Sequence, residues 1–194
     1  MKKLLAGLLL GVLIVLAVSC GGSAATEDTT SPSASPSPSP TVLTDAGLLT
    51  QFLAAVKPIR VRFRKLENAV DHVVWKDANQ NVIDASWPRA GHRVWKLTKR
   101  YDGIMVDLQL IDVPAFMRPA MKSLLKGLRI ERKMYDNIGT SLVNKESWGN
   151  YTSDGKLYEK LQSEAADAFD AWRIKAKLEA KRYGVKIPWK WTKP

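Results

Sequence analysis

The amino-acid sequence predicts an all-α fold, an up-down four-helix bundle formed by residues 42–194. Three observations support this class. In four segments of that range, apolar residues recur at steps of three and four, which places them on one face of a helix. The connections between the segments are short, so consecutive helices are expected to pack antiparallel. No run of residues has the length and composition that predict a strand.

The first predicted helix runs from Asp45 to Lys76. Thr44 precedes it and is a residue type that caps helix N-termini. Pro58 lies inside the pattern and removes one backbone donor. A less regular all-α array, with this helix divided at Pro58, is therefore the alternative to a regular bundle. The apolar stripe comprises Leu49, Phe52, Leu53, Val56, Ile59, Phe63, Leu66, Val70 and Val73.

The other three helices are bounded by similar signals. Ser86-Trp87-Pro88 resembles a cap followed by a helix start, and Asp112-Val113-Pro114 ends the second helix. Residues 144–155, rich in Asn, Ser, Thr and Gly, separate the third helix from the fourth, and Gly184 is the expected C-cap. The stripes are Val94, Leu97, Tyr101, Ile104, Leu108 and Ile111; Met117, Met121, Leu124, Leu128, Tyr135, Ile138 and Leu142; and Leu157, Leu161, Ala165, Ala168, Trp172, Ala176 and Tyr183.

Length and composition fit one compact domain with appendages. The chain has 194 residues, of which 45% are hydrophobic and 25% charged. These values exclude a collagen, a polytopic membrane protein and a fully disordered chain. The 30 Lys and Arg residues exceed the 19 Asp and Glu residues and give a net charge of +11. This surplus predicts attraction to anionic partners but indicates no reaction.

The N-terminus has the features of an export signal. Lys2 and Lys3 precede an uncharged apolar run, residues 4–18, which is shorter than the roughly 20 residues that a membrane-spanning helix needs. An uncleaved anchor is the alternative. The run ends at Leu16-Ala17-Val18-Ser19-Cys20-Gly21-Gly22, which resembles the lipobox of bacterial lipoproteins. Leucine is commonest where this chain has Ala17, and the resemblance covers residues 1–22 only.

That resemblance implies cleavage before Cys20 and acyl chains such as palmitate on this residue. The protein would then be lipid-anchored at the extracytoplasmic face of a bacterial cell membrane. Because Cys20 is the only cysteine, no internal disulfide is expected. The Ser/Pro-rich segment that follows predicts a disordered tether, about 3.1 Å long per residue when extended. The expected organisation is a leader (1–19), the lipidated Cys20 with its tether (20–41) and the helical domain (42–194).

No catalytic, cofactor-binding or metal-ligating residue is predicted. His72 and His92 lie opposite the apolar stripes of their helices, so both are expected to face outward. The chain has no Glu-x-x-His pair, no nucleophile elbow and no phosphate-binding glycine loop. We expect the domain to fold as a monomer without a metal or cofactor.

Two glutamates interrupt the apolar stripes. Glu131 and Glu179 are each expected to be partly buried, and a buried carboxylate needs a partner. Antiparallel packing places Glu131 near the level of Glu67 and Glu164. A carboxylate site is conceivable there, but Lys96, Lys99 and Arg132 are expected in the same layer, so we interpret the cluster as structural ion pairing.

The second helix carries a thinner apolar stripe of Trp95, Val106 and Leu110 opposite its main one. We expect the C-terminal tail (185–194) or residues 82–87 to cover it. An exposed partner groove is the alternative. Trp189-Lys190-Trp191 could instead lie at lipid headgroups.

A row of cations on the third helix is the strongest binding signal. Arg118, Lys122, Lys126, Arg129 and Lys133, here called the basic ridge, lie within an arc of about 80° at 100° per residue. Anionic envelope polymer or lipid headgroups are the expected partners. Nucleic acid is not expected outside the cytoplasm. The sequence thus predicts a lipid-anchored, non-enzymatic bundle that binds or organises an anionic envelope component. The alternative is a ligand-sensing or enzymatic bundle whose site is built from unremarkable residues.

Overall fold

The structure is a computed structural model that describes residues 43–77, 86–146 and 153–190. The predicted leader, the lipidation site Cys20 and the tether lie outside the described residues. Residues Thr41–Pro194 form one compact unit.

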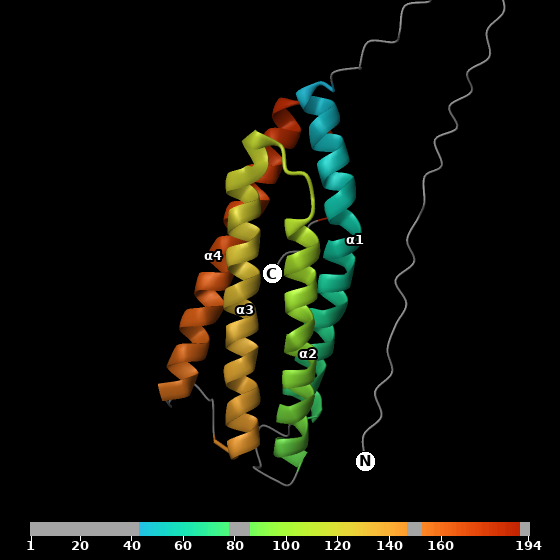
Figure 1. Ribbon diagram of the computed structural model, residues 1–194. Coiled ribbons are helices and arrows are strands. Elements are labelled where there is room, and N and C mark those ends of the chain that lie inside the picture. Colours follow the sequence, from blue (N-terminus) through green and yellow to red (C-terminus); the bar gives the residue numbers. More distant parts are fainter. Residues whose placement is uncertain (1–42, 78–85, 147–152, 191–194) are drawn as a thin grey trace, which may run out of the picture. The chain divides into compact units, whose positions relative to one another are not determined.

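The described chain is all-α and contains four long helices. In order these are α1 (Asp45–His72) with the π-helical turn η1 (Val73–Asp77), α2 (Ser86–Gln109), the 3-10 turn η2 (Ala115–Met117), α3 (Arg118–Asn144) and α4 (Ser153–Arg182). The helices alternate in direction, as Figure 1 shows. The predicted helical bundle is therefore confirmed. Pro58 lies inside α1, which continues as a single helix across it.

The predicted helix ends have the expected chemistry. The Thr44 hydroxyl accepts a hydrogen bond from the Gly47 backbone nitrogen at 3.2 Å and caps α1. Gly184 follows α4 with a φ of +65°, a conformation that favours glycine. Lys145 ends α3 with a φ of 56°.

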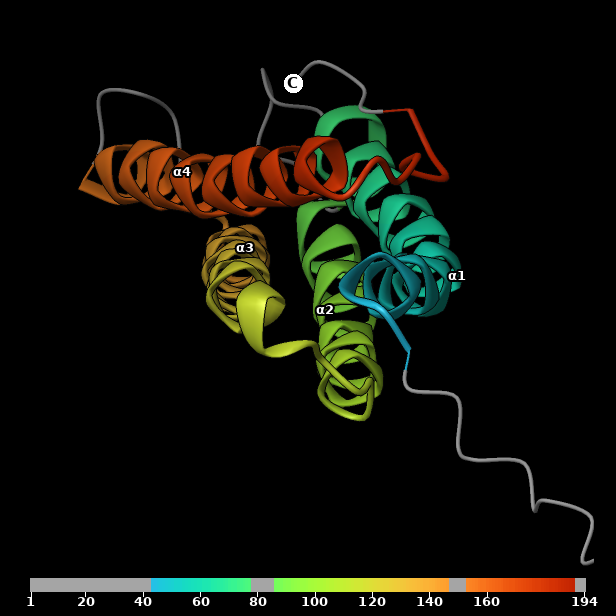
Figure 2. The same cartoon turned by 90° about the horizontal axis from the view of Figure 1, so that it is seen from above.

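The four helices do not pack equally around a central axis. α1 packs on α2, α2 on α3 and α3 on α4, whereas α1 and α4 are not closely packed against each other. Figure 2, a view from above, shows α2 and α3 nearly end-on and α4 lying across the view. The inclination of α4 carries its N-terminal half away from α1.

Glycine permits a close approach of the backbones of α2 and α3. A Cβ placed on Gly91 would lie 2.5 Å from the carbonyl oxygen of Gly139. A Cβ on Gly139 would lie 2.7 Å from the Trp95 ring. Both positions therefore exclude a side chain, and Gly139 is a packing residue as well as a weak helix former.

Aromatic pairs connect α1 and the following turn η1 to α4. Ring centroids are 6.1 Å apart for Phe52 and Trp172, 5.8 Å for Phe63 and Phe169, and 6.4 Å for Trp75 and Tyr158. Such pairs contribute about 0.5–1.5 kcal/mol each beyond their buried area. None of the helices in the described ranges combines the length and apolar character that crossing a membrane requires.

A candidate ligand pocket between α1 and α4

A pocket of about 460 Å³ lies in the space that the inclined α4 leaves beside α1. Side chains from all four helices line it, and most of its wall is apolar. Leu128 of α3, Phe63 of α1 and Phe169 of α4 belong to this apolar wall. The volume lies within the range of about 300–1,000 Å³ that is typical of small-molecule sites.

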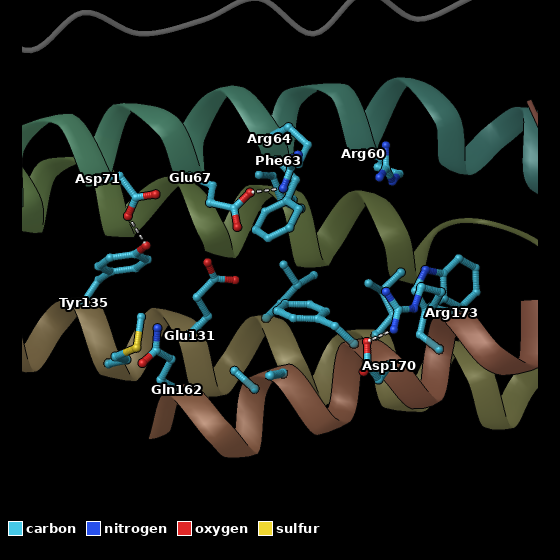
Figure 3. Close-up of a pocket in the computed structure, with 18 of the residues that line it drawn as sticks. Arg60, Phe63, Arg64, Glu67, Asp71, Glu131, Tyr135, Gln162, Asp170 and Arg173 are labelled. Atoms are coloured by element: carbon cyan, nitrogen blue, oxygen red, sulfur yellow. Dashed lines mark hydrogen bonds and ion pairs between the residues drawn. The ribbon is translucent and has the colours of Figure 1, made fainter. Parts of the chain in front are cut away.

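Three carboxyl groups gather at one end of the pocket, here called the acidic end. Glu67 and Asp71 project from α1, one helical turn apart, and Glu131 projects from α3. Figure 3 shows the carboxyl groups of Glu67 and Glu131 pointing toward each other across the pocket. Arg64 donates a hydrogen bond to Glu67 at 3.0 Å.

Glu131 is the most deeply buried of the three carboxyls, and among the described residues it forms no ion pair. Its side chain is only 5% exposed, and its buried Oε2 makes no hydrogen bond. Burial, with the negative charges of Glu67 and Asp71, raises the pKa of Glu131 well above its usual value of 4.5. The Tyr101 hydroxyl and the more distant charge of Arg64 act in the opposite direction. The carboxyl therefore holds its proton to a higher pH than an exposed glutamate does.

The negative charge of the acidic end also raises the pKa values of three tyrosines, Tyr101, Tyr135 and Tyr158. Tyr135 donates a hydrogen bond to Asp71 Oδ1 at 2.5 Å. Burial raises the pKa of Tyr101 and of Tyr135, and the carboxylates Glu131 and Asp71 raise both further. Burial and the same two carboxylates raise the pKa of Tyr158. Every one of these hydroxyls therefore holds its proton more tightly than in water.

Arginines lie toward the other end of the pocket, and they already have contacts. Arg173 forms an ion pair with Asp170 at 2.8 Å. The guanidinium of Arg60 lies 5.5 Å from the centre of the Trp189 ring. Burial and the charge of Arg64 lower the pKa of Arg60. Figure 3 thus shows the three carboxyls with Arg64 at one end of the pocket, and Arg60 with the Arg173–Asp170 ion pair toward the other.

The predicted ion pairing of Glu131 is wrong. Lys96 and Lys99 are exposed on α2. Arg132 pairs with Asp102 at 3.2 Å and with Asp136 at 3.8 Å. Because α3 directs Glu131 toward the pocket and its neighbour Arg132 toward α2, the two side chains lie on different faces of α3.

The two glutamates that were expected at the level of Glu131, Glu67 and Glu164, lie in different places. Glu164 pairs with Lys160 on its own helix at 4.0 Å, so it does not join the cluster. Glu67 is the one expected neighbour that reaches Glu131. Glu179 is 2% exposed and forms an ion pair with Lys175, which agrees with the expectation for a buried glutamate.

The structure places both histidines outside the pocket. His72 and His92 are exposed, as expected. Within the described ranges, no group of three or more His, Cys, Asp or Glu side chains could hold a metal ion. The acidic end is therefore not arranged as a metal centre.

The described part of the C-terminal tail, residues 185–190, does not cover the second stripe of α2. Val106 and Leu110 are 52% and 79% exposed. Trp95 packs separately and donates a hydrogen bond to the Asp136 carbonyl at 3.3 Å. The tail instead packs on the core through Val185, Ile187 and Trp189. Trp191 of the headgroup alternative lies outside the described residues.

The basic ridge is exposed along its whole length. In the part of the chain that the structure describes, none of its five cations forms an ion pair. The ridge therefore presents unneutralised charge to solvent, on a different surface from the pocket.

Sequence periodicity indicated that Glu131 faces inward but missed the pocket. The available signal was the combination of a carboxyl in the stripe of α3 with Glu67 at the same level of α1. That signal lacked the inclination of α4, which creates the cavity. No protein-family model, curated protein or solved structure matches this chain.

Proposed function

We propose that the chain is a lipid-anchored, extracytoplasmic helical bundle that binds a small organic molecule in the pocket between α1 and α4. The observation that carries the binding proposal is Glu131, whose buried carboxyl faces a largely apolar cavity without an ionic partner. Leaving a buried polar group unpaired costs a protein about 1–3 kcal/mol. A ligand that pairs with the carboxyl recovers this cost.

The composition of the pocket supports this function. Ligand sites are mainly apolar, with a few polar groups that fix orientation. In this pocket the apolar wall contributes binding affinity, and the carboxyl groups of the acidic end fix the orientation of the ligand. Anchoring rests on the leader and on the sequence around Cys20, which resembles a lipobox. The tether, at about 3.1 Å per residue, supports access of the pocket to molecules outside the membrane.

Blocking the pocket tests the binding proposal. Ala166 lines the pocket from α4 and is exposed, so we expect Ala166→Trp to obstruct the opening of the cavity without removing a core residue. The protein is extracted from the cell envelope, and small molecules released on denaturation are identified by mass spectrometry. We expect a molecule that is enriched with the wild-type chain and lost with Ala166→Trp.

Ala171→Trp is the matched control because Ala171 is exposed on the same helix and does not line the pocket. It should retain the molecule. Equal small-molecule content in the wild-type chain and Ala166→Trp would contradict the proposal.

A second candidate function is electrostatic binding of an anionic envelope surface through the basic ridge. The exposure of all five cations supports it. Each cation near an anionic membrane contributes about 1 kcal/mol, and salt weakens the attraction. Charge reversal at Lys122, Lys126 and Arg129 should abolish binding of residues 42–194 to phosphatidylglycerol vesicles at low salt.

The control changes net charge equally on another helix. Lys96, Lys99 and Arg100 are exposed on α2, and their reversal should weaken vesicle binding much less. If both triple variants bind equally, net charge alone determines the attraction and the ridge has no specific role.

A further inference from the structure

The acidic end of the pocket has an unsatisfied requirement for positive charge. Glu131 is buried, and in Figure 3 it points into the pocket from α3 toward Glu67 of α1. The nearest cation, Arg64, already donates to Glu67 at 3.0 Å. Asp71 accepts a hydrogen bond from a neutral phenol, Tyr135. One guanidinium therefore faces three carboxyl groups, and in the described residues it pairs with Glu67 and not with Asp71 or the more deeply buried Glu131.

A bare metal ion does not satisfy this arrangement. Metal ligands converge on one point at about 2–2.6 Å, and no set of carboxyls in the described ranges converges in this way. The three groups instead project from two helices that face each other across the pocket. An ammonium group, which has several N–H donors and a larger radius, can reach carboxyl groups that are spread in this manner.

The remainder of the pocket accommodates an apolar body. Phe63, Phe169 and Leu128 line its middle, and Tyr135 and Tyr158 flank the acidic end. Aromatic faces attract cations within about 6 Å and also stack on flat apolar groups. At the far end, Arg173 and Asp170 neutralise each other, and Arg60 lies over Trp189. That end therefore offers a cationic ligand no comparable attraction.

We propose that the pocket binds an organic monocation, with its ammonium group at Glu131, Glu67 and Asp71 and its apolar body against the paired rings of Phe63 and Phe169. This inference rests on the proposed function and adds the charge and orientation of the ligand. An anionic ligand would have to displace Asp170 from Arg173, whereas a cation breaks no ion pair at Glu131.

Proton affinity at the acidic end gives the inference a second measurable consequence. The charged and titratable groups that face Glu131 are Glu67, Asp71 and Arg64 from α1, Tyr101 from α2, Tyr135 from its own helix and Tyr158 from α4. Together they favour the protonated carboxyl. A bound ammonium favours the ionised carboxyl, so binding releases a proton from Glu131.

The test compares three probes that differ only in their head group. 4-Phenylbutylamine, 4-phenylbutanol and 4-phenylbutanoate are titrated into the purified full-length chain at near-neutral pH, and binding is followed by NMR. We expect the amine to bind at least about tenfold more tightly than the alcohol, and the carboxylate to bind most weakly. Glu131→Gln should remove the preference for the amine and should change binding of the alcohol much less.

Glu164→Gln is the matched control because this glutamate lies on the surface of α4 outside the pocket lining. It should bind all three probes as the wild-type chain does. Calorimetry in phosphate and in HEPES measures proton release by the wild-type chain without relying on any variant. We expect up to one proton to be released when the amine binds and none when the alcohol binds.

The outcomes distinguish the two levels of the proposal. Equal binding of amine and alcohol, or tighter binding of the carboxylate, overturns the cation inference and leaves the ligand pocket standing. No binding of any probe to the wild-type chain, with Ala166→Trp behaving identically, overturns the proposed function as well.

Discussion

The hydroxyl of Tyr135 and the carboxyl of Asp71 form a hydrogen bond of 2.5 Å that joins α3 to α1 across the acidic end of the pocket. The two residues are 64 positions apart in the sequence, and the bond spans helices that are not adjacent in the bundle. It provides Asp71 with a donor and leaves Glu131, one turn before Tyr135 on α3, without an ion pair. Asp71 and Glu131 therefore lie in different electrostatic environments, although both belong to the acidic end.

Glu131→Gln should remove a pH-dependent cost from the folded protein. The pKa of Glu131 is raised in the folded state, above an ordinary value of 4.5. At pH values between the unfolded-state and the folded-state pKa, the folded state binds more protons than the unfolded state, so the free energy of unfolding falls as pH rises. At pH values above the folded-state pKa, each unit by which that pKa exceeds the unfolded-state value lowers the free energy of unfolding by about 1.4 kcal/mol. From about pH 4 to about pH 8, the free energy of unfolding of Glu131→Gln should rise relative to that of the wild-type chain by about 1 kcal/mol or more. Denaturant unfolding across this pH range measures the difference.

Glu164→Gln is again the control, since its side chain is 45% exposed and lies outside the pocket lining. Its stability should follow the wild-type pH profile. A constant difference between Glu131→Gln and the wild-type chain across the whole range would mean that Glu131 titrates normally.

The sequence predicted local chemistry well and the spacing of the helices poorly. Thr44 and Gly184 were identified because caps depend on residues within a few positions of each other. Periodicity placed Glu131 on the inward face for the same reason. The separation of α1 from α4 depends on how α4 crosses α3, and periodicity contains no information about that crossing. The partners of Glu131 were therefore predicted incorrectly.

Gly91→Ala should destabilise the bundle strongly. Its Cβ would meet a backbone carbonyl of α3 at 2.5 Å, so the two helices must separate. Overpacking of this kind costs about 1–3 kcal/mol or more. Gly103→Ala on the same helix is the control because nothing lies within 4 Å of its Cβ. It should stabilise the fold by up to about 1 kcal/mol through helix propensity. Chemical denaturation measures both, and equal effects would contradict the close approach of α2 and α3.

Cys20→Ala should abolish lipid anchoring. A thioether requires the Cys20 sulfur, and the chain has no other cysteine. Two or three acyl chains hold a protein at a membrane far more firmly than one. Intact-mass analysis and membrane fractionation should show an acylated, membrane-bound wild-type chain and an unacylated variant. An unmodified Cys20 in the native protein would contradict the prediction.

Gly127→Ala tests the wall of the pocket, because the Phe169 ring lies directly on this glycine. A Cβ on Gly127 would lie 2.7 Å from Phe169 Cε1, so the ring must move toward the pocket that it lines. We expect the variant to lose about 1–3 kcal/mol of stability, less the gain of up to about 1 kcal/mol from helix propensity.

A double-mutant cycle separates the two contributions. Phe169→Ala removes the ring and is itself expected to cost as much as about 3–5 kcal/mol. In that background, Gly127→Ala meets no ring, so its effect should change sign and become stabilising by up to about 1 kcal/mol. Denaturant unfolding of the four chains gives the coupling energy. A coupling near zero would show that Phe169 does not rest on Gly127, and that the pocket wall on α4 lies elsewhere.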